Sequence, residues 1–207
     1  MNLPYQIKTI DEFRDSTLVE KKSTFIAIIK SADSEDKVKD CLAEVKKKYF
    51  DAAHHCYAYR FADGSFRYSD AGEPSGTAGI RILNAIDHFE LTNLIVIVIR
   101  YFGGIKLGTG TLGKTYYLAA YEVLIKSSII SKQLFQKAII KSKFDKVSAI
   151  HKILTTYNSV VIKSDYTEIV SLSCLLIVKD LEIISEKLVK TSKNEAILIT
   201  SDEFLYK

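Results

Sequence analysis

The chain of 207 residues contains no tryptophan, one methionine, two prolines and three cysteines. Cys41, Cys56 and Cys174 are odd in number and far apart, which is typical of free thiols in a reducing cytoplasm and argues against disulfides or a zinc site. The longest apolar run, Leu94 to Ile99, is far shorter than the roughly 18 residues of a membrane-spanning helix. The start of the chain, Met1 to Gln6, lacks the pattern of a signal peptide. We therefore expect a cytoplasmic protein with no metal, no cofactor and no membrane partner.

Glycine and arginine are missing from large parts of the chain. All nine glycines fall between Gly64 and Gly113, and no arginine follows Arg100. The last 77 residues carry 12 lysines and no arginine. Arginine makes directional contacts with phosphate and carboxylate, whereas lysine often only solvates a surface. The distribution of arginine therefore places the expected functional site within residues 1–130. The net charge of +4 is too small for a nucleic-acid arm.

The glycines gather in two clusters. The first glycine cluster is Asp70-Ala-Gly-Glu-Pro-Ser-Gly-Thr-Ala-Gly79, and the second is Arg100-Tyr-Phe-Gly-Gly-Ile-Lys-Leu-Gly-Thr-Gly110. Glycine is favoured where the backbone needs a positive φ or a close approach to another group. The clusters therefore predict a specialised backbone surface.

Hydrophobic periodicity predicts alternating strands and helices around these clusters. In residues 1–130 we expect one bent or two strands over 17–30, a helix over 34–49 with Ser34 as N-cap, and strands over 54–62 and 66–69. A helix should follow the first cluster, with Ile82, Leu83, Ile86 and Phe89 on one face. Residues 94–100 should form a central strand covered on both faces, and residues 111–125 a helix.

Residues 131–207 differ in composition from the rest of the chain, because they lack glycine, proline and arginine. Their pattern predicts a ferredoxin-like βαββαβ unit. Its elements are expected over 135–143, 146–157, 160–165, 169–178, 181–191 and 195–204, with a short polar linker at residues 128–132.

The string from Gly108 to Thr115 matches G-x-x-x-x-G-K-[ST], the phosphate-loop pattern. A phosphate loop directly follows a strand, but residues 102–107 intervene here after the strand that ends near Arg100. No strand in residues 1–130 ends in the acidic residue that magnesium needs. The alternative is a tight loop that lets the next helix pack closely. A nucleotide site is therefore kept only as an alternative function.

The first cluster brings Glu73, Ser75 and Thr77 to the start of a helix, where backbone amides favour anions. Ordinary capping by Ser75 or Thr77 is the competing interpretation. A hydrolase would use Ser75 as nucleophile, His54 or His55 as base and Asp70 to orient it. The pattern G-x-S-x-G is not matched, however, and neighbouring strand residues point to opposite faces, so at most one histidine faces the site.

Aromatic and basic residues alternate through the same region, as in surfaces that stack bases and bind phosphates. Residues 54–116 nevertheless hold six basic and five acidic residues, and many of the tyrosines could belong to the core. The set comprises Tyr57, Tyr59, Arg60, Arg67, Tyr68, Arg100, Tyr101, Lys106 and Lys114.

The two clusters resemble the signature of the IMPACT/YigZ family, D-x-G-E-P-S-G-T-A-G followed by R-Y-F-G-G-x-x-L-G-x-G-G-L. The chain departs from it at Thr111, where glycine is common, at Lys114, where arginine is usual, and at Arg81, where proline is usual. The resemblance implies a first domain like the second domain of ribosomal protein S-five and a ferredoxin-like domain like the last domain of elongation factor G. It also implies a link to translation regulation and the stress response, with RNA or ribosome contact and no firmly attached catalytic activity.

We therefore expect an α+β protein with domains at residues 1–130 and 131–207. Its expected function is that of a non-enzymatic binding protein for RNA, the ribosome or a translation-related protein, with the oligomeric state left open. A hydrolase and a nucleotide-binding protein remain the alternatives. The expected anion-accepting residues are Asp70, Gly72, Glu73, Ser75, Gly76, Thr77, Gly79, Arg100, Tyr101, Gly103, Gly104, Lys106, Gly108, Gly110 and Lys114.

Overall fold

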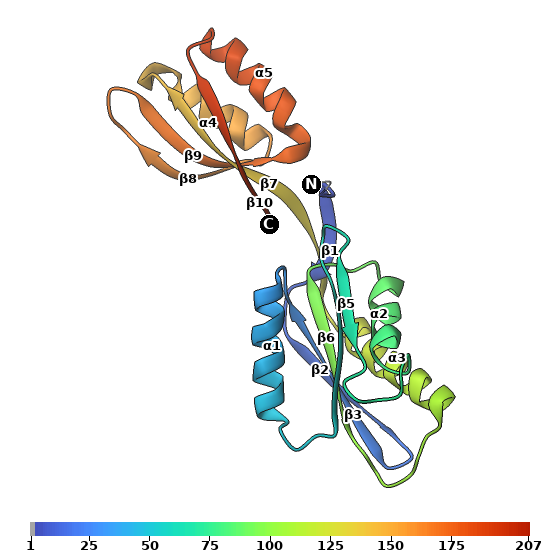
Figure 1. Ribbon diagram of the computed structural model, residues 1–207. Helices are drawn as coiled ribbons and strands as arrows, with labels where there is room; N and C mark the ends of the chain where they lie inside the picture. Colours follow the sequence, from blue (N-terminus) through green and yellow to red (C-terminus); the bar gives the residue numbers. More distant parts are fainter. Residues whose placement is uncertain (1–2) are drawn as a thin grey trace. The chain divides into compact units, whose positions relative to one another are not determined.

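The computed structural model describes residues 3–207 and divides into two compact units (Figure 1). The first unit comprises residues 7–131, and the second comprises residues 3–6 together with residues 132–207. The mixture of helices and antiparallel strands confirms the predicted α+β class. Among residues 3–207, no helix combines the length and the apolar composition needed to cross a membrane.

The first unit is built on an antiparallel sheet with the strand order β2-β3-β6-β4-β5. The hairpin of β2 and β3 confirms the two-strand version of the prediction for residues 17–30. The strands are β2 (Arg14–Glu20), β3 (Ser23–Ser31), β4 (His54–Arg60), β5 (Phe66–Ser69) and β6 (Leu94–Tyr101).

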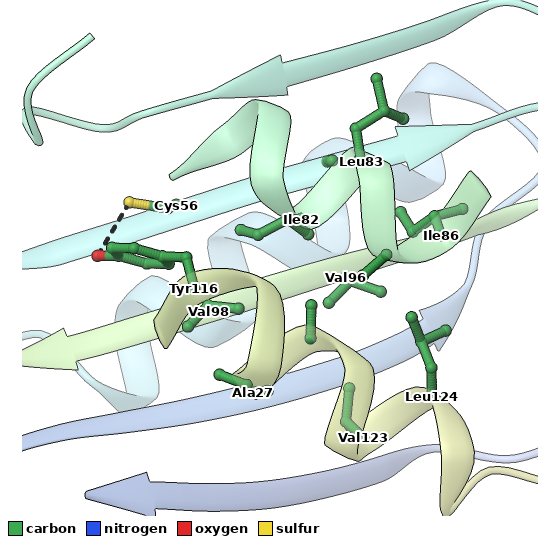
Figure 2. Close-up of a cluster of buried hydrophobic side chains, with 14 of the residues drawn as sticks. Ala27, Cys56, Ile82, Leu83, Ile86, Val96, Val98, Tyr116, Val123 and Leu124 are labelled. Atoms are coloured by element: carbon green, nitrogen blue, oxygen red, sulfur yellow. Dashed lines mark hydrogen bonds between the residues drawn. The ribbon is translucent and has the colours of Figure 1, made fainter. Parts of the chain in front are cut away.

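Helices cover both faces of this sheet. Helix α1 (Glu35–Lys48) lies on one face, and α2 (Gly79–His88) and α3 (Thr109–Ile125) lie on the other (Figure 1). The central strand β6 is buried on both sides, as predicted: Ile97 belongs to the α1 core, whereas Val96 and Val98 belong to the α2–α3 core (Figure 2). Successive strand residues point to opposite faces, so the sheet supplies two separate cores.

The local signals in this unit act as expected. The Ser34 hydroxyl oxygen accepts a hydrogen bond from the Lys37 amide at 3.4 Å and caps α1. In α2, Ile82, Leu83 and Ile86 are buried against the sheet, as their helical spacing requires.

The second unit has the predicted order of strands and helices, β7-α4-β8-β9-α5-β10. Its sheet runs β10-β7-β9-β8, and the helices pack on one face with a core that includes Ile140, Leu154 and Leu188. The elements are β7 (Ile129–Ser142), α4 (Val147–Thr156), β8 (Val160–Asp165), β9 (Val170–Ile177), α5 (Leu181–Ser192) and β10 (Ile197–Tyr206).

Two features of this sheet depart from the sequence prediction. Strand β1 (Gln6–Ile10) pairs with β7, although no strand was expected there. Residues 129–132, expected within a linker, form the beginning of β7. The reason is common to both: a strand stabilised by a partner more than a hundred residues away carries little local signal.

Candidate functional site

The first glycine cluster is organised by the carboxylate of Asp70, which stands just after β5. One oxygen of Asp70 accepts from the Gly76 amide at 2.9 Å, and the other accepts from the amides of Ala78 and Gly79 at 2.9 and 2.8 Å. Helix α2 has no cap from the side chain of its own N-cap residue, Ala78. Asp70 therefore caps α2 from outside the helix, and its negative charge suits a helix N-terminus.

This arrangement corrects the expectation that the start of α2 is free to accept an anion. The amides of Gly76 and Gly79 are already bonded to a carboxylate of the chain itself. The Thr77 hydroxyl donates to the Pro74 carbonyl at 2.6 Å. Capping does explain the cluster, but the cap is Asp70 and not Ser75 or Thr77.

The glycines of the first cluster are required by this closed loop. Gly72 and Gly76 have φ values of +86° and +76°, which a residue with a side chain rarely adopts. A Cβ added to Gly79 would lie 2.7 Å from the backbone nitrogen of Ser69. The close approach of α2 to β5 therefore depends on Gly79.

A buried ion pair joins the two clusters. The Oε1 atom of Glu73 accepts from the Arg100 guanidinium and from the Tyr116 hydroxyl, both at 2.7 Å. The side chains of Glu73 and Arg100 are 3% and 6% exposed. Arg100 lies between the rings of Phe25 and Phe102, with centroid distances of 5.4 and 5.5 Å. Arg100 was expected to offer positive charge to a ligand, but that charge is neutralised inside the protein.

Cys56 and Tyr116 extend this network toward the core of the unit (Figure 2). The Cys56 sulfur lies 3.3 Å from the Tyr116 hydroxyl oxygen and 3.0 Å from the Asp70 carbonyl oxygen. Burial raises the pKa of the Cys56 thiol to about 12 and also raises the pKa of Tyr116. A thiol that stays protonated is a poor nucleophile, so these groups act as hydrogen-bonding parts of the core.

The two histidines of β4 face opposite sides of the sheet, as predicted. His54 is paired with Arg100 across the strands, and its Nε2 lies 3.9 Å from Glu73 Oε2. The Nδ1 of His54 lies 2.9 Å from the Ala71 carbonyl oxygen. His55 instead contacts the Tyr49 carbonyl oxygen at 3.0 Å, and burial lowers its pKa.

A hydrolase relay is not assembled around Ser75. Ser75 is exposed, and among residues 3–207 no hydrogen bond joins it to a histidine. Asp70, the expected orienting carboxylate, bonds to backbone amides. Nucleophilic catalysis needs the nucleophile, the base and the orienting group in one hydrogen-bonded series, whereas here both histidines and Asp70 bond to backbone groups instead.

The segment from Gly108 to Thr115 does not have the conformation of a phosphate loop. Helix α3 begins at Thr109, so most of the matching string is helical. The Thr115 hydroxyl, which would bind magnesium in a phosphate loop, is buried and donates to the Thr111 carbonyl at 2.8 Å. A phosphate loop cradles its ligand with the amides of a loop that precedes the helix, and here the helix has replaced that loop.

In the second cluster, Gly103 lies against the β2–β3 turn. A Cβ added to Gly103 would lie 2.0 Å from the Lys22 carbonyl oxygen, and the Gly103 amide donates to the Ser23 hydroxyl at 3.2 Å. Gly104 and Gly108 have φ values of +85° and +78°. The loop from residue 102 to residue 108 therefore follows a path that only glycine permits.

Tyr101 belongs to the opposite side of the sheet from Arg100. Its hydroxyl donates to Asp51 at 2.8 Å, and its ring packs with Tyr57 against the α1 core. Tyr59 is buried in the same core and bonds to Glu35. These three tyrosines, expected to alternate with basic groups on a binding surface, are instead largely part of the core beneath α1.

A hollow of about 290 Å³ lies at the start of α3, and we call it the α3 groove. It is lined by Arg81, Asn84, Thr109, Gly110, Gly113, Lys114 and Tyr117.

Helix α3 has Gly108 as its N-cap, no side-chain cap and no acidic residue in its first turn. A Cβ on Gly113 would lie 3.3 Å from the Arg81 side chain, so this glycine lets Arg81 pack across α3. The start of α3 therefore has no side-chain cap and lies beside two cationic side chains, unlike the start of α2.

The groove contains two predicted residues, Gly110 and Lys114, together with Arg81, which was noted as a departure from the family pattern. Asn84 and Tyr117 were not predicted. They follow Arg81 and Lys114 by three positions, and this helical spacing is the signal that could have found them. Lys106 is exposed in the preceding loop. In the described part of the chain, no three His, Cys, Asp or Glu side chains are placed to hold a metal ion.

The comparisons with known proteins agree with this architecture. A family model described as the Impact N-terminal domain matches residues 21–124, which include both glycine clusters. The chain is 31% identical over 193 residues to IMPACT family member YigZ of Escherichia coli, covering 90% of this chain and 95% of that protein. The chain therefore belongs to the IMPACT family.

A further relative matches a smaller part of the chain, and a solved structure matches nearly all of it. IMPACT family member YvyE of Bacillus subtilis is 32% identical over 130 residues, which is 62% of this chain and 60% of that protein. A solved structure described as "Crystal structure of an hypothetical protein" superimposes with a TM-score of 0.72 at 27% identity. It covers 97% of this chain and 100% of that chain, so the same fold extends over both units.

Proposed function

We propose that this protein is a non-enzymatic binding protein that acts in translation by contacting RNA, on or near the ribosome, through the α3 groove. The observation that carries the proposal is the groove itself. It is concave, it lies at an uncapped helix N-terminus, and its lining includes Arg81 and Lys114 but no acidic residue. Backbone amides at such a helix end, together with two cations, favour a phosphate group.

The modest charge of the chain sets the expected mode of binding. With a net charge of +4, affinity has to come from a few well-placed phosphate contacts. Arg81 can make a bidentate contact with phosphate, whereas Lys114 acts as a point charge. The resemblance to the IMPACT/YigZ family supplies the link with translation.

The first cluster has a supporting role in this proposal. Asp70 and Glu73 are bonded inside the protein, and they hold α2 and β6 in place. Arg81 stands in the first turns of α2, so the cap provided by Asp70 fixes the helix that carries one of the two groove cations.

A double variant tests the groove directly. The full chain and Arg81→Ala/Lys114→Ala would be compared by sedimentation with ribosomes and by binding to RNA across a salt series. Each lost phosphate contact on a single strand should reduce the slope of log affinity against log salt by about 0.7, or about 1.4 for the pair. Lys46→Ala/Lys47→Ala is the matched control, because it removes two exposed lysines from α1 on the other face of the sheet. Equal affinity and equal slope for the groove variant would contradict the proposal.

A further inference from the structure

The β2–β3 hairpin ends in an unusual two-residue turn. Its central residues, Lys21 and Lys22, have φ values of +45° and +67°. Positive φ at both positions is the requirement of a type I′ turn, for which Asn-Gly is the preferred sequence. Residues with long side chains are strained in this conformation. The chain therefore keeps two lysines where another pair would fold more readily.

Both lysines present their charge to solvent. Lys21 and Lys22 are exposed, and within residues 3–207 neither forms an ion pair. Lys106, in the loop of the second cluster, is also exposed and makes no ion pair in the same part of the chain. Glu20 is the acidic neighbour in the hairpin and is half-buried. These three lysines therefore carry positive charge that no ion pair within residues 3–207 neutralises.

The hairpin turn and the loop of the second cluster form one surface. The Gly103 amide donates to the Ser23 hydroxyl, and Gly103 lies so close to Lys22 that no side chain would fit between them. Figure 1 shows the β2–β3 turn and the β6–α3 loop at the same end of the first unit. We call this surface the hairpin–loop tip and define it by Lys21, Lys22, Phe102 and Lys106.

Phe102 gives the tip an aromatic face. Its side chain is 52% exposed, although its ring contacts the Arg100 guanidinium at 5.5 Å. Arg100 is itself fixed by the buried bond to Glu73. One part of the ring is therefore held by a rigid cation, and another part is open to solvent. An exposed aromatic ring beside lysines is the combination that single-stranded nucleic acids bind, by stacking and phosphate contact.

We infer that the hairpin–loop tip binds single-stranded RNA, with phosphates on Lys21, Lys22 and Lys106 and a base stacked on Phe102. This inference rests on the proposed function for the identity of the partner, and it adds a second contact surface and the form of the RNA. It also explains the strained turn, because Asn-Gly would fold more easily but would remove two charges from the tip.

The first test replaces the strained pair in the full-length chain. Lys21→Asn/Lys22→Gly should raise the melting temperature by about 2–4 °C. Its affinity for a fluorescently labelled single-stranded RNA should fall about fivefold, with a salt slope lower by about 1.4. A gain in stability combined with a loss of binding cannot come from damage to the fold. Lys46→Ala/Lys47→Ala again controls for total charge. Unchanged RNA affinity in the turn variant would overturn the inference.

The second test addresses stacking. Phe102→Ala should weaken binding of the same RNA about tenfold, since one stacked base contributes from about fivefold to about a hundredfold in affinity. Phe102→Trp should retain affinity, and its fluorescence should change on RNA binding with no other tryptophan in the chain. Duplex RNA and vesicles containing phosphatidylserine serve as competitors. Preference for duplex or vesicles over the single strand would contradict the inference.

The two surfaces can fail separately. If Arg81→Ala/Lys114→Ala weakens RNA binding while both tip variants bind normally, the inference about the hairpin–loop tip is contradicted and the proposed function stands. If only the tip variants lose affinity, the inference stands and the proposed role of the α3 groove in RNA binding is contradicted. If the unmodified protein binds no RNA, both are wrong.

Discussion

The two glycine clusters are rich in the same residue, but the first is closed on itself and the second opens toward solvent. In the first, Asp70 occupies the amides at the start of α2, and Glu73 pairs with Arg100 in the core. In the second, Gly108 begins α3 without a side-chain cap, and the α3 groove lies beside it.

The difference shows that glycine density identifies special backbone but not its purpose. The decisive feature is whether an acidic side chain of the protein already satisfies the amides that glycine exposes. Where Asp70 does so, the helix end is part of the architecture. Where no such residue is present, the same kind of helix end is available to an external anion.

The largest effect should come from breaking the link between the clusters. Glu73→Ala leaves the Arg100 guanidinium buried without its partner, and such a loss costs about 4 kcal/mol of unfolding free energy. Denaturant unfolding of the first unit measures it. Glu90→Ala removes the exposed pair with Lys8 and should leave stability nearly unchanged. A small loss for Glu73→Ala would mean that the buried pair is not what holds the clusters together.

The next effect concerns the closed cluster alone. Gly79→Ala places a methyl group 2.7 Å from the Ser69 backbone. Backbone atoms, unlike the end of a flexible side chain, cannot move aside by a side-chain rotation, so β5 and α2 must shift apart. We expect a loss of about 3 kcal/mol by overpacking, measured by thermal and denaturant unfolding. Stability equal to that of the unmodified protein would show that α2 and β5 can separate freely.

Alkaline pH should weaken the junction between the clusters. The pKa of Cys56 is about 12 in the folded protein against 9.0 for an ordinary thiol, and the pKa of Tyr116 is also raised. Above pH 9 the unfolded chain therefore loses protons that the folded chain keeps, so the unfolding free energy falls as pH rises toward 12.

Between pH 9 and 10.5 the loss should be about 2 kcal/mol for the two groups together. Unfolding curves at a series of pH values measure this loss. Cys56→Ala should show a shallower decline, because one of the two groups is gone. A flat profile in the unmodified protein would indicate that water reaches the junction.

The smallest effect is expected in the open cluster, at Gly110. A Cβ added there meets no atom within 4 Å, and alanine favours a helix over glycine. Gly110→Ala should therefore raise stability by about 0.5 kcal/mol, while its methyl group narrows the groove and weakens RNA binding. If Gly110→Ala were less stable than the unmodified protein, the expected difference in sign from Gly79→Ala would be contradicted.

Much of the fold follows from local patterns. The Ser34 cap, the alternating residues of β4 and the apolar run of β6 each predicted the observed element. The whole βαββαβ order was predictable because each helix and strand there has a clear period. Strand β1 was not, since its pairing with β7 depends on residues far along the chain.

The site was predictable only in part. The residue types and the two clusters indicated the region of the site, but the sequence did not indicate the hydrogen-bond partners of these residues. The local sequence does not indicate that Arg100 pairs with Glu73, or that Tyr101 packs against the α1 core while Arg100 lies on the opposite face of the sheet. The alternation of a strand separates the two side chains, and the register of β6 decides which face each receives.

The sequence by itself determined the alternation of elements, the two glycine clusters and the restriction of arginine to the first half, because these depend on the identity and spacing of nearby residues. Tertiary structure alone decided which helix start stays open. The Asp70 carboxylate, just after β5, reached α2 across eight or nine residues of chain, whereas α3 begins after Gly108 with no side-chain cap. Electrostatic satisfaction depends on distance in space, and only the folded chain sets those distances.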